Sequence, residues 1–89
     1  MTRYAVSPDA ACAPVEDGAV VLNMRTKRYY SLNETGAAVW RFLEDDMDVE
    51  GVVARIIELY DVDEVEARRT VAILLDELSG EALIAPVTA

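Results

Sequence analysis

The sequence contains no histidine and a single cysteine, Cys12. Without histidine the chain can form no Ser-His-Asp triad, no Cys-His pair and no zinc site of the usual Cys/His kind. A lone cysteine cannot form an internal disulfide, which is typical of a reducing cytoplasm, and nothing nearby marks Cys12 as a reactive thiol. These absences exclude most enzyme classes, so we expect a protein that is not an enzyme and binds no metal or other cofactor.

Long hydrophobic runs are also missing. No stretch approaches the roughly 20 apolar residues that cross a bilayer, and Pro8 and Asp9 interrupt the N-terminal stretch before a signal-peptide core could form. We therefore expect a cytoplasmic protein with no membrane contact. The 89 residues, 53% of them hydrophobic, suffice for one domain over residues 1–89, with a core from about 11 to 85, and are too few for two domains.

Basic residues are scarce, with 8 against 17 acids and a net charge of -9. Ten of the acids lie between Glu44 and Glu66, where Arg55 is the only base. This acidic stretch is either a solvated helix surface with its caps or a docking surface for a basic partner. Because nucleic-acid affinity depends mostly on neutralising phosphates, we expect no nucleic-acid partner.

The first third of the chain has the pattern of a β-meander. Asp17-Gly18 predicts a two-residue hairpin turn of type I′, which needs positive φ, and a second reversal is predicted at 25–27. Apolar and β-branched residues around these turns favour extended structure. The pattern predicts three short strands, at about 11–16, 19–24 and 28–32.

Three helices are predicted to follow, each beginning at a side chain that can cap it: Asn33, Asp48 and Asp63. The first runs to about residue 44 and the third to about residue 79, where Gly80 is placed to adopt the left-handed conformation that ends a helix. The order of elements predicts an α+β domain like a winged helix-turn-helix, with a three-stranded antiparallel sheet followed by three helices.

The third predicted helix has an unusual flank. At 100° per residue its core stripe consists of Val71, Leu74, Leu75 and Leu78. Beside this stripe the side chains are small, aliphatic or of either charge: Val65, Arg69, Ala72, Ile73 and Asp76. The flank is either a wide apolar stripe or the wall of a groove for an apolar ligand with a polar group. The helix carries more acids than bases, which makes it a poor reader of a DNA major groove.

The stretch from Gly18 to Trp40, GAVVLNMRTKRYYSLNETGAAVW, resembles the signature of the PqqD-like family. These are leader-peptide recognition proteins (RiPP recognition elements) of ribosomal peptide natural-product pathways. Residues 60–63 and 78–84 also match, so the resemblance covers about residues 15–84. The aromatic strand pattern is most similar to the stand-alone leader-binding proteins of lasso-peptide biosynthesis. Family members usually have glycine where this chain has Lys27, and lysine at positive φ costs about 1 kcal/mol more.

The resemblance implies non-catalytic binding of a precursor's leader peptide, which adds as a further strand along residues 28–32 against the third helix. It implies delivery of that leader to a cysteine-type leader peptidase, with a cyclase as a further partner. Either the acidic stretch or the outer sheet face is expected to contact the peptidase. The alternatives are a peptide chaperone of another, radical SAM-linked pathway and a winged-helix transcriptional regulator.

The predicted peptide-binding residues come from the third strand and from the third helix. Asp76 and Arg69 either orient a polar group of the peptide or pair with each other. Leu32 is expected to be part of the core, while Tyr29 and Ser31 face the opposite side of the sheet. The full predicted set is Arg28, Tyr29, Tyr30, Ser31, Leu32, Val65, Arg68, Arg69, Ala72, Ile73 and Asp76.

Overall fold

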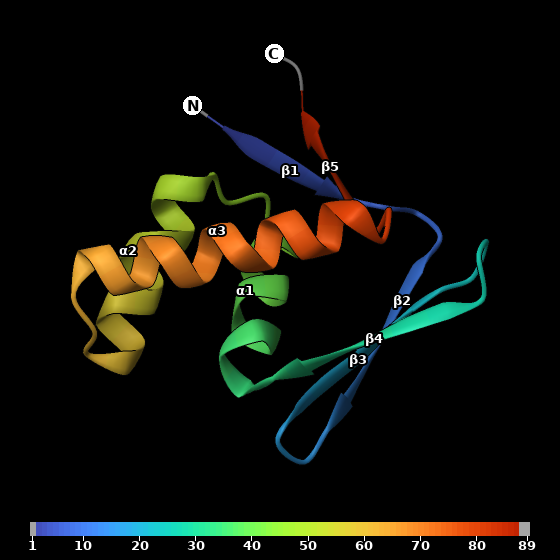
Figure 1. Ribbon diagram of the computed structural model, residues 1–89, viewed down its shortest axis with the longest axis horizontal. Helices are drawn as coiled ribbons and strands as arrows, with labels where there is room; N and C mark the ends of the chain where they lie inside the picture. The colour runs from blue at the N-terminus through green and yellow to red at the C-terminus, as the bar shows by residue number, and fades with distance from the viewer. Residues whose placement is uncertain (1, 88–89) are drawn as a thin grey trace.

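The computed structural model describes residues 2–87 and has the predicted α+β architecture (Figure 1). A three-stranded antiparallel sheet is followed by three helices, and two short terminal strands form a second sheet. The elements are β1 (Arg3–Val6), β2 (Ala10–Val15), β3 (Gly18–Asn23), β4 (Arg28–Asn33), α1 (Glu34–Glu44), α2 (Val49–Tyr60), α3 (Glu64–Gly80) and β5 (Ile84–Val87).

The three predicted N-caps are confirmed. Each cap residue has extended backbone, and its side-chain oxygen accepts a hydrogen bond from the amide three residues later, which satisfies an otherwise free donor of the first turn. The distances are 2.8 Å for Asn33, 2.7 Å for Asp48 and 2.8 Å for Asp63. Local sequence therefore determines where all three helices begin.

The β2–β3 turn differs from the predicted type. Val15 pairs with Gly18, so Glu16 and Asp17 form the two-residue loop, and neither has positive φ. Type I′ needs positive φ at both central residues, so that prediction is wrong. Gly18 is needed after the turn because a Cβ there would overlap the carbonyl oxygen of Leu32 on the neighbouring strand.

The end of α3 also differs from the prediction. Gly80 is helical, and Ala82 adopts the left-handed conformation with a φ of 58°. The amide of Leu83 bonds to the carbonyl of Leu78 at 3.0 Å and that of Ala82 to Ser79 at 3.0 Å, the pattern of a Schellman motif. The motif lies two residues beyond the glycine because Leu83, which is buried, must turn back into the core.

The small terminal sheet was not predicted. β1 pairs antiparallel with β5, from Arg3 opposite Val87 to Val6 opposite Ile84. Tyr4 and Val6 pack against the core, so the packed body extends beyond the predicted N-terminal limit of about residue 11. The strands are only four residues long and β5 contains Pro86, so neither has a strong local signal.

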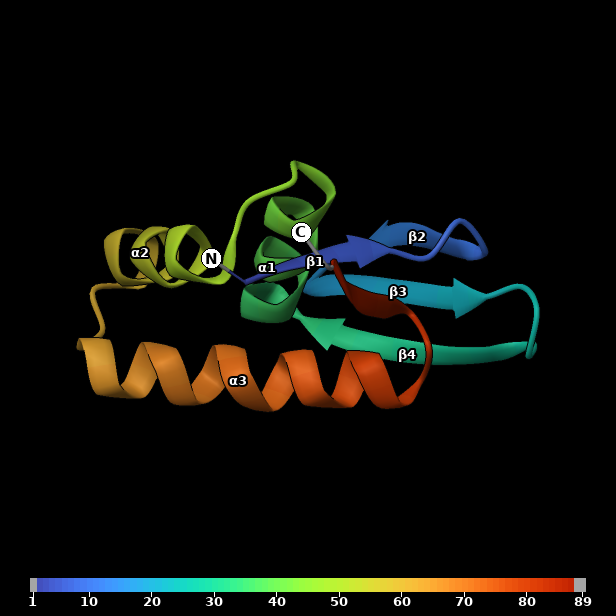
Figure 2. The same cartoon turned by 90° about the horizontal axis from the view of Figure 1, so that it is seen from above.

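The core lies between the sheet and the helices, with α1 in the centre (Figure 2). Val39, Trp40 and Leu43 of α1 are buried, and Val71, Leu75 and Leu78 of α3 pack on the same core. Leu32 is buried at the end of β4, as expected. No helix within residues 2–87 is long and apolar enough to cross a membrane.

Candidate functional site

β4 is an edge strand whose outer side pairs with no other strand in the described part of the chain. Neighbouring residues of an antiparallel ladder direct their backbone groups to opposite sides. Asn23 accepts a bond from the Lys27 amide at 2.8 Å, so it faces β4. The backbone groups of its register partner Arg28 therefore point toward β3. The alternation leaves the amides of Tyr29, Ser31 and Asn33 pointing away from β3, toward the open edge. β4 thus offers a regular row of donors and acceptors to an added strand.

β2 is the other edge of the same sheet, and its outer side is blunted. The Met24 amide bonds to the Asp9 carbonyl at 2.8 Å. By the same alternation, the backbone groups of Ala10, Cys12 and Pro14 point away from β3, toward the open edge. Proline has no amide to donate, and the Ala10 amide already bonds to the Ser7 carbonyl at 3.1 Å. Proline at such a position is a usual protection of edge strands. The two edges therefore differ, and only β4 is open along its length.

A groove of about 260 Å³ lies between β4 and α3. Its floor includes Leu32, which belongs to the core, and its α3 wall includes Ile73, whose side chain is 54% exposed. Such a groove can receive an apolar side chain of a strand that pairs with β4. The lining residues are Tyr30, Ser31, Leu32, Asn33, Gly36, Thr70, Ile73, Leu74 and Glu77.

Two polar contacts join β4 to α3 and to its C-cap residue, near the β3–β4 turn. The Tyr30 hydroxyl donates to Oε1 of Glu77 at 2.6 Å, and the Arg28 guanidinium donates to both carboxylate oxygens of Glu81 at 3.0 and 3.2 Å. The hydrogen bond to Glu77, with burial, raises the pKa of Tyr30 to about 12. These contacts hold the strand beside the helix.

A buried asparagine fixes the β3–β4 turn. Asn23 is 1% exposed, and its Oδ1 accepts from the amides of Arg25 and Thr26 at 3.0 and 3.2 Å. Its Nδ2 donates to the Glu81 carbonyl at 3.2 Å, which ties the turn to the end of α3. Lys27 has a φ of 67°, so the turn keeps the conformation that favours glycine, and these bonds offset its cost.

The structure separates the predicted α3 residues into different surfaces. Ile73 lines the groove beside β4. Arg68, Ala72 and Asp76 instead line a second hollow, which lies between α3, α2 and the β1 end of the chain. Val65 and Arg69 line neither. The helix thus turns Ile73 to the sheet side of the core stripe and turns Arg68, Ala72 and Asp76 to the α2 side. Which of these residues contact a peptide stays a prediction.

The second hollow is bordered by ion pairs. Arg68 donates to both oxygens of Glu50 at 2.7 and 2.6 Å and to Glu64 at 2.8 Å. The bonds to Arg68 hold the pKa of Glu50 below its ordinary value. Arg69 pairs with Glu66 at 3.5 Å, so the alternative in which it pairs with Asp76 is not observed. Several acids of the acidic stretch are thus engaged as caps or ion pairs.

Five groove residues, Asn33 among them, lie outside the predicted set, although helical geometry could have indicated some of them. Thr70 and Glu77 lie three and four residues from Ile73, and such spacings share a helix face, while Leu74 belongs to the predicted core stripe. Gly36 lies at the start of α1, where only the fold brings it to the groove. The missing information was which flank of α3 faces the sheet.

Cys12 lies on the opposite edge of the sheet, on β2. The thiol is exposed, but burial of its surroundings and the nearby Glu44 carboxylate raise its pKa, so the nucleophilic thiolate is disfavoured. The groove between β4 and α3 contains no cysteine. Its chemistry is that of backbone hydrogen bonding with an apolar floor.

The fold and this site define a class: a small α+β domain of winged-helix type with an open sheet edge beside a helix. The chain belongs to the PqqD family, since residues 18–84 match the model of coenzyme PQQ synthesis protein D. No curated protein matches the chain.

Two solved structures are similar to the whole chain. The first is TbiB1 in complex with the TbiA(beta) leader peptide, with 26% identity, a TM-score of 0.87, and coverage of 96% of this chain and 99% of that chain. The second is a lasso peptide synthetase B1 complexed with the leader peptide, with 26% identity, a TM-score of 0.84, and coverage of 94% and 99%.

Proposed function

We propose that this protein binds the leader segment of a ribosomally made precursor peptide, without catalysis, in lasso-peptide maturation. The observation that carries the proposal is the open β4 edge beside an apolar groove. The two similar structures, both bound to leader peptides at 26% identity over nearly the whole chain, support it. The leader would pair with Tyr29, Ser31 and Asn33 of β4 and place alternate side chains against Ile73.

The energetics of such a complex favour moderate affinity. Burying three apolar side chains contributes about 5–8 kcal/mol before losses, and each backbone hydrogen bond adds about 1 kcal/mol net. Ordering a flexible leader costs several kcal/mol. A dissociation constant between about 1 nM and 1 μM follows, which is tight enough to capture a precursor and weak enough to release it.

Binding alone does not explain a dedicated protein, so the bound leader must be transferred. We infer that the protein presents the leader to a cysteine-type leader peptidase, after which a cyclase acts on the freed peptide. Strand addition suits this role because it holds the leader in one extended conformation and leaves the remainder of the precursor free.

Two measurements test these statements separately. Isothermal titration with the leader encoded beside this gene should give one-to-one binding, and hydrogen exchange should show new protection of the amides of Tyr29, Ser31 and Asn33. Binding without such protection would contradict strand addition at β4.

For delivery, the peptidase should cleave the precursor faster in the presence of this protein. Equal cleavage rates with and without it would refute delivery and leave leader binding intact.

A further inference from the structure

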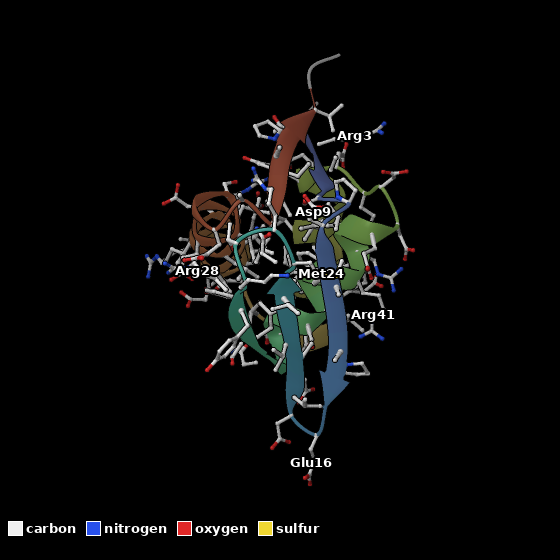
Figure 3. The ribbon with its side chains drawn as sticks, turned by 90° about the vertical axis from the view of Figure 1, so that its right-hand side faces the viewer. Arg3, Asp9, Glu16, Met24, Arg28 and Arg41 are labelled. Atoms are coloured by element: carbon white, nitrogen blue, oxygen red, sulfur yellow. The ribbon has the colours of Figure 1, made fainter. Side chains whose placement is uncertain are left out.

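The face of the sheet that points away from α1 carries no charged side chain. Antiparallel sheets that pack only one face on the core usually place polar residues on the face that meets water. Here Val15, Leu22 and Tyr29 on that face are 52%, 39% and 70% exposed. Figure 3 views the sheet from this side. The register places the outer-face side chains opposite one another: Ala11, Ala13, Val15, Val20, Leu22, Tyr29 and Ser31. An apolar face of this kind marks an interaction surface.

The two ends of this outer face carry opposite charges. The β2–β3 turn contributes Glu16 and Asp17, both exposed. The β3–β4 turn at the other end contributes Arg25 and Lys27, both exposed. Arg25 has one long contact to Asp9, at 3.8 Å, and Lys27 has no ion pair within the described residues 2–87. A partner of matching chemistry is uncharged in the middle, basic at one end and acidic at the other.

We propose that the outer face packs against the same face of a second copy of this chain. A two-fold axis in the interface, perpendicular to the strands, reverses their direction and places β3 on β3. Glu16 and Asp17 of each copy then approach Arg25 and Lys27 of the other, whereas an axis along the strands would bring like charges together. The charges of the outer face are therefore complementary to those of a second copy turned end to end. They favour the axis perpendicular to the strands over the axis along them.

The edges of the sheet are poor alternatives for self-association. Pro14 and the engaged Ala10 amide blunt β2, and β4 is the edge that the proposed function assigns to the leader. Face-to-face packing leaves both β4 edges open and on the same side of the dimer. Two bound leaders would each add a strand and stack on each other, so leader binding extends the interface.

The size of the face sets the expected strength. Three strands of six residues cover about 14 by 20 Å from standard strand spacings, which is small for a stable dimer. We therefore expect association in the micromolar range that strengthens when the leader adds a fourth strand. The linkage to the leader rests on the proposed function; the association of the free protein does not.

Sedimentation of the full-length protein over a range of concentrations tests the dimer. Wild type should show a reversible monomer–dimer equilibrium, and Leu22→Lys should weaken it at least tenfold. Leu22→Thr, which retains strand propensity, should weaken it less, and the circular dichroism spectra of both variants should match that of wild type. Leu59→Lys, at a similarly exposed site on α2, is the control and should leave it unchanged. Wild type that stays monomeric to about 1 mM overturns the proposal.

A charge exchange tests the orientation. Glu16→Lys alone and Lys27→Glu alone should each weaken association several-fold, and the double variant should restore it. Failure of the double variant to recover overturns the antiparallel arrangement.

The third test repeats the sedimentation measurement with leader peptide added. A face-to-face dimer should persist or strengthen when leader is added, whereas a dimer paired through the β4 edges would dissociate and overturn the proposal. A second outcome would also overturn the proposal: wild type is monomeric, and Leu22→Lys retains leader affinity but slows cleavage by the peptidase. That result would assign the outer face to the peptidase. A failure of leader binding itself appears in the titration and leaves the sedimentation result of the free protein valid.

Discussion

The two sides of α3 are held to the rest of the protein by different means. On the sheet side, the buried Asn23 ties the β3–β4 turn to the carbonyl of Glu81, and the groove beyond it is open and apolar. On the α2 side, the exposed ion pair of Arg68 with Glu50 joins the two helices. Because buried polar contacts are costly to break and exposed ion pairs contribute little, the polar contact of Asn23 is the stronger of these two.

The largest effect on stability is expected on the sheet side. Asn23→Leu removes three hydrogen bonds at a buried position and should lower the free energy of unfolding by about 2–4 kcal/mol, measured by urea denaturation. Thr26→Ala, which removes one exposed bond in the same turn, is the matched control and should cost about 0.5 kcal/mol. A loss below about 1 kcal/mol for Asn23→Leu would show that the two attachments are equivalent.

The comparison extends to leader affinity. Ile73→Asp places a carboxylate in the groove wall and should weaken leader binding by about 2–3 kcal/mol, roughly 30- to 160-fold, in an isothermal titration. Val65→Asp changes another exposed β-branched residue of the same helix and should leave affinity within about threefold. Equal losses at both positions would mean that the peptide crosses α3, as the sequence-based grouping predicted.

A smaller effect is expected on the α2 side. Arg68→Met retains the aliphatic stem but removes the bonds to Glu50 and Glu64, and should lower the free energy of unfolding less than Asn23→Leu does. The loss should shrink further at high salt because exposed pairs are screened. Leader affinity should be unchanged; a large loss would place this surface in the binding site.

The smallest effect concerns Tyr30. Tyr30→Phe removes the hydrogen bond to Glu77 and should lower stability by less than about 1 kcal/mol near neutral pH. Because the folded-state pKa is raised to about 12 from 10.0, the contribution is complete below pH 10 and is lost as pH rises toward 12. Urea denaturation of both proteins from pH 8 to 11.5 should show the difference disappearing. A constant difference across this range would contradict the role of Glu77.

Much of the fold could be predicted because its signals are local. The caps at Asn33, Asp48 and Asp63 require only a side chain and an amide three residues away. The apolar spacing of α1 is equally local. The predictions failed where distant residues decide the geometry: at Gly80, where the burial of Leu83 moves the helix end, and in the pairing of β1 with β5. Of the predicted site residues, Tyr30, Ser31, Leu32 and Ile73 line the groove, whereas Arg68, Ala72 and Asp76 line the second hollow; their part in peptide binding stays a prediction.

By itself, the sequence determined the absence of histidine chemistry, the start of each helix and the presence of an exposed aliphatic flank on α3, since all three depend on residue type and short spacing. Tertiary structure alone decided which flank of that helix faces β4. It also decided that β4 is an open edge while β2 is blunted, because an edge exists only once strands have paired. Strand pairing and helix rotation are set by contacts between residues far apart in the chain.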